Sequence, residues 1–175
     1  MKKVWIENGY LIFSKKGLVG LKIEPLAKIV NKSKSSFYHH FADLEIFTDE
    51  LLTHHLKKSR EIAQKEYKAK NINPELINIL IEHKTDIFFN QQLRFNRHIK
   101  SFETALLTSN KLVGEAFIAV WLNDLNLKLN MSQIEGIFSI ALDNFFLQIT
   151  EKNYTHKWLT DYFETLKTSI QKLMK

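Results

Sequence analysis

The stretch from Asn31 to Phe41, NKSKSSFYHHF, places two lysines, three serines, a tyrosine and two histidines within eleven residues. Phe37 and Phe41 are four residues apart, a spacing that puts both side chains on one face of a helix. They are expected to anchor a short helix to a core, as Val30 anchors the segment before it. The polar residues then occupy the free face. The stretch therefore predicts either a solvated helix or a surface that contacts a partner with many negative charges.

The positive charge of the chain is concentrated at its N-terminal end. The 175 residues carry a net charge of +6, and residues 1–40 hold eight lysines against only Glu7 and Glu24, so the remainder is balanced. A basic end on a neutral body is typical of a nucleic-acid-binding head, because phosphates neutralised by lysine release their counterions. A basic end that only keeps the protein soluble is the alternative.

The composition favours an all-α fold. The chain has only five glycines and two prolines, and 45% of its residues are hydrophobic, as in an ordinary globular protein. The absence of cysteine excludes disulfides, thiolate metal sites and cysteine nucleophiles. The N-terminus lacks the pattern of a signal peptide, and polar residues interrupt the most apolar stretch, Ile134 to Ile149. We therefore expect a cytoplasmic protein without a membrane segment.

The first helices are predicted from apolar spacing and local cap residues. A first helix should end near Lys16, where Gly17 offers a left-handed cap. Two short helices, 22–30 and 33–40, should follow on either side of a tight turn, with Asn31 in a left-handed conformation and Ser33 as an N-cap. Asp43 should cap a fourth, much longer helix. The far half of that helix carries Glu61–Lys65 and Glu66–Lys70 pairs and is predicted to be a solvated connector.

Beyond Pro74 the pattern predicts five more helices, at about 75–90, 93–107, 110–128, 131–150 and 155–174. Ser109, Asn130 with Ser132, and Thr155 are the expected caps. The predicted architecture is all-α, with about nine helices. It comprises a three-helix helix-turn-helix head at residues 1–45 and a helical body at residues 46–175.

A short helix, a tight turn and a second short helix with polar side chains form a helix-turn-helix, whose second helix can enter the DNA major groove. Residues 11–47, LIFSKKGLVGLKIEPLAKIVNKSKSSFYHHFADLEIF, resemble the N-terminal DNA-binding domain of the TetR family of bacterial transcriptional repressors. The resemblance lies in an aromatic residue and a glycine that close the first helix, the "I…LA" second helix, and a recognition helix that begins "SK" and ends in "YHHF".

The resemblance implies that Lys34 and Tyr38 contact backbone phosphates. It also implies that Lys22 faces the DNA backbone and that Ser35, Ser36 and His39 neighbour base edges or phosphates. The expected DNA-binding residues are Lys22, Lys32, Ser33, Lys34, Ser35, Ser36, Tyr38 and His39.

Three residues depart from the family pattern. Leu21 stands where a threonine usually contacts phosphate, Asn31 replaces the turn glycine, and Leu44 replaces a lysine at the start of the fourth helix. The first and last changes remove expected phosphate contacts, so affinity should depend more on Lys32 and Lys34.

The resemblance further implies a body that binds a small effector and forms a homodimer. The apolar residues of helix 131–150 extend too far around its circumference for one core-facing stripe, so this helix and the last one are expected to form the dimer interface. The body is rich in large aromatic residues, which suit a pocket for an apolar or aromatic effector but equally suit a tightly packed core without a cavity. The candidate lining residues are Phe89, Phe102, Phe117, Trp121 and Phe145, with His98 or Asn144 as the polar group.

No motif for catalysis or metal binding is found. No glutamate is followed by a histidine three residues later, as a di-iron bundle requires, and the zinc-protease, P-loop and dinucleotide motifs are absent. His54, His55, His83 and His98 lack carboxylates at a ligand spacing. We expect no enzyme activity and no cofactor. The sequence predicts a ligand-responsive repressor that binds a near-palindromic duplex DNA operator, or alternatively a helical module whose basic end binds an acidic protein or RNA.

Overall fold

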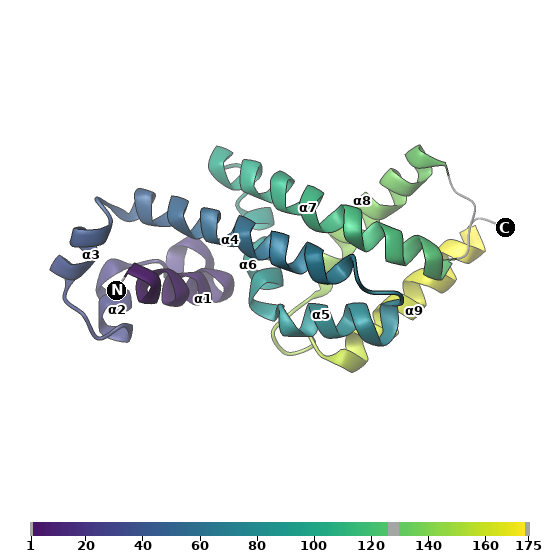
Figure 1. Cartoon of the computed structure of the whole chain (residues 1–175), viewed down its shortest axis with the longest axis horizontal. Helices are drawn as coiled ribbons and strands as arrows, with labels where there is room; N and C mark the ends of the chain where they lie inside the picture. The colour runs from purple at the N-terminus through teal and green to yellow at the C-terminus, as the bar shows by residue number, and fades with distance from the viewer. Residues whose placement is uncertain (1, 126–129, 174–175) are drawn as a thin grey trace. The chain divides into compact units, whose positions relative to one another are not determined.

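The computed structural model describes residues 2–125 and 130–173, and these residues form helices joined by turns, with no strand (Figure 1). The all-α prediction is confirmed. The helices are α1 (Lys2–Gly20), α2 (Ile23–Ile29), α3 (Lys34–His40), α4 (Leu44–Glu66), a short π-helical turn η1 (Ile72–Leu76), α5 (Ile77–Glu82), α6 (Lys84–Phe95), α7 (Lys100–Leu125), α8 (Met131–Gln148) and α9 (His156–Leu173).

The chain divides into two compact units. The head unit contains Met1–Glu61 and Thr85–Leu112, and the body unit contains Ile62–Lys84 and Val113–Lys175. Helices α4 and α7 each contribute residues to both units. The predicted boundary at residue 45 lies near the start of α4, inside the head unit, so the functional division into residues 1–45 and 46–175 stays a prediction.

An aromatic cluster holds α3 in the head unit. Phe37 is fully buried, and its ring centroid lies 5.4 Å from that of Trp5, 5.1 Å from Phe41 and 5.3 Å from Phe47. Val30 is also buried, at 8% exposure. The predicted anchoring of α3 by Phe37 and Phe41 is therefore confirmed.

The same core extends to α6 and α7. The Phe13 ring of α1 lies 4.4 Å from Phe89 of α6 and 5.6 Å from Phe102 of α7. These residues belong to one continuous hydrophobic cluster with Trp5 and Phe37. The helix-turn-helix consequently shares its core with helices that begin more than forty residues later in the chain.

The turns and caps of the head follow the sequence prediction. Gly17 and Asn31 have left-handed backbones, with φ of 60° and 52°. The Ser33 hydroxyl accepts the Ser36 N–H at 3.1 Å, and the Asp43 carboxylate accepts the Ile46 N–H at 2.8 Å. In the body, Asn130 forms a capping box with Gln133, and Thr155 accepts the Trp158 N–H. Local chemistry therefore determines where most of these helices begin.

Two predicted helices differ from the structure. The expected helix 75–90 is interrupted at His83, which caps α5 before α6 begins. The expected helices 93–107 and 110–128 are instead the end of α6 and one long helix, α7. Ser109 is not a cap, because its hydroxyl lies inside α7, where it donates to the Leu106 carbonyl and accepts from the Asn90 amide, each at 2.9 Å. The predicted ends at 126–128 and 174 lie outside the described residues.

The prediction of a solvated far half of α4 is wrong. Ile62, Ala63 and Glu66 are all buried, with Glu66 at 0% exposure. The predicted i,i+4 ion pairs are replaced by Lys58 with Glu61 and by Lys65 with Glu82 of α5. The end of α4 is therefore a core element, and tertiary packing decides its environment.

Helix α7 has the length and apolar composition that would allow it to cross a membrane. In this structure its side chains Phe102, Leu106, Ala116 and Trp121 are buried inside the protein. Burial of this kind is typical of the core helix of a helical bundle.

Candidate nucleic-acid interface and body groove

The helix-turn-helix consists of α2 and α3, joined by the turn at Asn31 (Figure 1). Lys22 is the N-cap residue of α2, with an extended backbone. Ser33 is the N-cap residue of α3, and α3 is only seven residues long. The predicted DNA-binding residues are exposed except for the half-buried Ser36: Lys22, Lys32, Ser33, Lys34, Ser35, Tyr38 and His39. The structure therefore presents the predicted polar set on the free side of α3 and its flanking residues.

Tyr38 combines a fixed ring with an exposed surface. The residue is 55% exposed, and its ring meets the buried Phe37 ring edge-on at 5.5 Å. A tyrosine held in this way presents its polar end without losing much conformational freedom on binding.

An ion pair joins the starts of α2 and α3. The Lys34 ammonium lies 3.0 Å from the Glu24 carboxylate, and both side chains are more than half exposed. The hydrogen bond and charge of Lys34, with a smaller contribution from Lys28, lower the pKa of the Glu24 carboxyl. The sequence analysis missed Glu24, although it is the only acidic residue between Lys22 and His40.

The departures from the family pattern have structural reasons. Leu21 is 2% exposed and lies in the head core, and the partly buried Leu44 packs against the same core. Both leucines contribute apolar packing where a polar side chain would contact phosphate. Asn31 adopts the left-handed backbone of the turn glycine that it replaces, which an asparagine tolerates.

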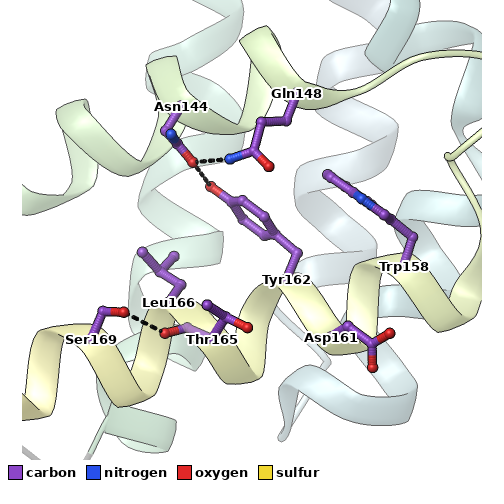
Figure 2. Close-up of a pocket in the computed structure, with 8 residues that line it drawn as sticks. All are labelled: Asn144, Gln148, Trp158, Asp161, Tyr162, Thr165, Leu166 and Ser169. Carbon is purple, nitrogen blue, oxygen red and sulfur yellow. Dashed lines mark hydrogen bonds between the residues drawn. The ribbon is translucent and has the colours of Figure 1, made fainter.

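A groove of about 320 Å³ lies between α8 and α9 in the body unit (Figure 2). The Tyr162 hydroxyl donates to the Ala141 carbonyl at 3.0 Å, and the Gln148 amide donates to the Asn144 side-chain oxygen at 2.6 Å. The Trp158 ring stacks on Tyr162 with centroids 5.2 Å apart. Partial burial raises the pKa of the Tyr162 hydroxyl to about 12, so it is a neutral hydrogen-bond donor. The groove is lined by Asn144, Gln148, Trp158, Asp161, Tyr162, Thr165, Leu166 and Ser169.

Comparisons with known proteins identify the fold through structure alone. No protein-family profile and no curated protein sequence matches the chain. A transcriptional regulator of the TetR/AcrR family from Aquifex aeolicus superposes with a TM-score of 0.62 at 20% identity, over 99% of both chains. The multidrug-binding protein EbrR, solved in complex with malachite green, superposes with a TM-score of 0.55 at 15% identity, over 94% of this chain and 96% of its own. The chain has the TetR-family fold.

Within this TetR-family fold, the predicted effector-lining residues fall in both compact units. Phe89 and Phe102 are fully or almost fully buried in the head unit, where Phe89 stacks on Tyr10 at 4.2 Å. His98 is an exposed residue of the same unit. Phe117, Trp121, Asn144 and Phe145 belong to the body unit. A single pocket that contains all of them stays a prediction, and Asn144 is the member that lines the groove between α8 and α9.

The body aromatics are packed against one another. The Phe117 ring lies 5.9 Å from Phe138 and 5.8 Å from Phe163, and Trp121 lies 6.1 Å from Phe138. Gly114 allows this approach, because an added Cβ would lie 3.3 Å from the Phe138 ring. These contacts make the interior of the body apolar and aromatic.

Glu66, at the end of α4, is a buried carboxyl group in the body unit. It is 0% exposed, and neither carboxylate oxygen has a hydrogen-bond partner in the described part of the chain. Burial raises the pKa of this carboxyl to about 8, since the charged form loses its hydration. Glu66 is therefore protonated in the folded protein at neutral pH, an arrangement that the predicted Glu66–Lys70 pair did not anticipate.

The raised pKa predicts that the protein is most stable in mild acid. Stability is complete below the ordinary glutamate pKa and falls as the pH rises through about 8, because the unfolded chain releases the proton more readily. The loss between those limits should be of the order of 4 kcal/mol. Urea unfolding followed by circular dichroism at a series of pH values measures it. Glu66→Gln should flatten this dependence, whereas Glu151→Gln, at an exposed position, should preserve it, and an unchanged slope in Glu66→Gln would contradict the assignment.

Proposed function

We propose that the chain is a cytoplasmic transcriptional regulator, a repressor that binds a near-palindromic duplex DNA operator as a homodimer and responds to a small effector. The observation that carries the proposal is the exposed basic and hydroxyl face of α3, held on a buried aromatic anchor. The structural neighbours support it, because they are described as transcriptional regulators. The proposed role is regulatory rather than catalytic.

The dimensions of α3 suit the major groove of DNA. Seven helical residues extend about 10 Å at 1.5 Å per residue, and the groove is about 12 Å wide. The major groove of A-form RNA is too narrow and deep for a helix. Duplex DNA is therefore favoured over RNA, and a salt-dependent preference for DNA would distinguish this proposal from a module that binds an acidic protein.

Loss of a lysine from the proposed interface should weaken binding to every DNA sequence. Lys22→Ala removes one phosphate contact and is expected to lower the slope of log affinity against log salt by roughly 0.9. Tyr38→Ala should weaken binding without changing sequence preference, whereas Ser36 and His39 substitutions should alter that preference. Fluorescence anisotropy with random and selected duplexes measures both effects.

Matched substitutions in the body unit serve as controls for the DNA experiment. Lys152→Ala and Tyr67→Ala remove the same groups from other exposed positions and should leave affinity unchanged. Equal effects of Tyr38→Ala and Tyr67→Ala would contradict the assignment of α3 as the recognition helix.

The proposed dimer interface is supported by an exposed apolar face on α8. Ile140 and Leu147 are 73% and 76% exposed, and they are seven residues apart, so they share one side of the helix. Gly136 lies on the same side, and a Cβ added there would meet no atom within 4 Å. We infer that this face and the groove between α8 and α9 are covered by the same helices of a second copy, in a four-helix interface about a two-fold axis.

The protein should sediment as a dimer at micromolar concentration, twice the mass of its 20.6 kDa chain. Ile140→Asp and Leu147→Asp together should give a folded monomer, because a charge buried without a partner strongly disfavours the interface. Leu107→Asp, at a 62% exposed position of α7, is the control and should remain dimeric. A monomeric wild-type protein would exclude the proposed dimer.

The effector proposal rests on the aromatic interior of the body and on the structural neighbour solved with malachite green. A genuine effector among apolar and aromatic metabolites should raise stability by RT ln(1 + [L]/Kd), about 2.7 kcal/mol at a hundredfold excess over Kd. It should also change DNA affinity over the same concentration range, and Trp121→Ala should alter the stabilisation. Thermal unfolding and DNA anisotropy measure both responses, and a compound that changes only one of them would not be the effector.

A further inference from the structure

Glu24 stands alone as a negative charge on the helix-turn-helix. It lies in the first turn of α2, and no other acidic residue occurs between Lys22 and His40. Its carboxylate is 3.0 Å from the ammonium of Lys34, the first residue of α3. Lys34 is one of the residues that the proposed function assigns to a DNA phosphate.

The position of Glu24 creates a competition for Lys34. A phosphate oxygen that binds an ammonium lies about 2.8 Å from it. If Lys34 kept its position, this oxygen would lie within about 6 Å of the Glu24 carboxylate, which is inside the Debye length of about 8 Å at physiological salt. Either Lys34 leaves Glu24 or a phosphate approaches an unscreened carboxylate. Both routes oppose DNA binding.

We propose that Glu24 is an affinity-setting residue of the DNA-binding surface, which competes with phosphate for Lys34 and lowers affinity for all duplex sequences alike. This inference rests on the proposed DNA-binding function. Glu24 acts on the phosphate contact and not on base edges, so it changes the strength and salt dependence of binding without changing sequence preference.

The alternative role for the pair is purely structural, with Glu24 joining α2 to α3. The two roles predict opposite signs. Glu24→Gln should strengthen DNA binding if Glu24 competes with phosphate, and should weaken both DNA binding and thermal stability if the ion pair holds the two helices together.

Affinity for random-sequence duplex DNA, measured by anisotropy over a salt series, tests the proposal with full-length protein. Glu24→Gln is expected to raise affinity by up to about fivefold, the range of exposed ion pairs. It should also steepen the salt slope by up to roughly 0.9, because one more lysine becomes free to displace counterions. The control is Glu7→Gln, which makes the same charge change at an exposed residue paired with Lys3 of α1 and should have a smaller effect.

A double-mutant cycle isolates the coupling. Lys34→Ala should cost more affinity in the Glu24→Gln background than in the wild-type protein, since Lys34 is then no longer shared. Equal costs, a weaker Glu24→Gln variant, or equal effects of Glu24→Gln and Glu7→Gln would each overturn the proposal. In all of these cases a wild-type protein that binds DNA leaves the proposed function standing. A wild-type protein that binds no duplex overturns both.

Discussion

The burial of the Phe37 ring is the contact on which the head depends. Trp5 of α1, Phe41 at the end of α3 and Phe47 of α4 surround this ring, so three helices meet at one side chain. Each aromatic pair adds about 0.5–1.5 kcal/mol beyond simple area burial. Because α3 has only seven residues, it has little stability of its own and takes its orientation from these contacts. The exposed face of α3 is consequently set by its buried face.

Close packing and a buried polar network connect this core to later parts of the chain. A Cβ on Gly9 would lie 2.3 Å from the Phe47 ring, so α1 approaches α4 where only glycine fits. The Tyr10 hydroxyl donates to the Asp86 carboxylate of α6 at 2.8 Å and lies 2.8 Å from the His55 Nδ1 of α4. Burial lowers the pKa of His55 to about 4, so its imidazole is neutral. A movement of α6 must therefore be accommodated by α1 and α4, which gives the regulatory proposal a physical route to the head.

The electrostatics of the head are less uniform than its net charge indicates. The positive excess lies in the first forty residues, and Lys22 and Lys32 are exposed at the helix-turn-helix. Lys34 is held by Glu24, and Leu21 and Leu44 are turned to the core. The surface therefore combines fewer phosphate contacts with an internal competitor, and its hydroxyl and histidine side chains occupy a larger share of the free face of α3. Such a surface favours recognition of base edges over strong general attraction to DNA.

The sequence by itself determined the features that depend on neighbouring residues. Gly17, Asn31, Ser33 and Asp43 act through their own backbone or a hydrogen bond three residues away, and the Phe37 and Phe41 spacing selects the exposed face of α3. Most of the proposed DNA-binding surface could be predicted for this reason. The fold family also followed from these local motifs.

Only the tertiary structure decided the features that depend on distant partners. Ser109 stays inside α7 because its hydroxyl bonds to Asn90 on α6, and Glu24 was missed because its partner lies on another helix. The Glu66 carboxyl is uncharged at neutral pH because the body unit buries it, although its sequence neighbours indicate an exposed ion pair. Local patterns report helix faces and caps, whereas burial and ion pairing are set by which helices the fold brings together.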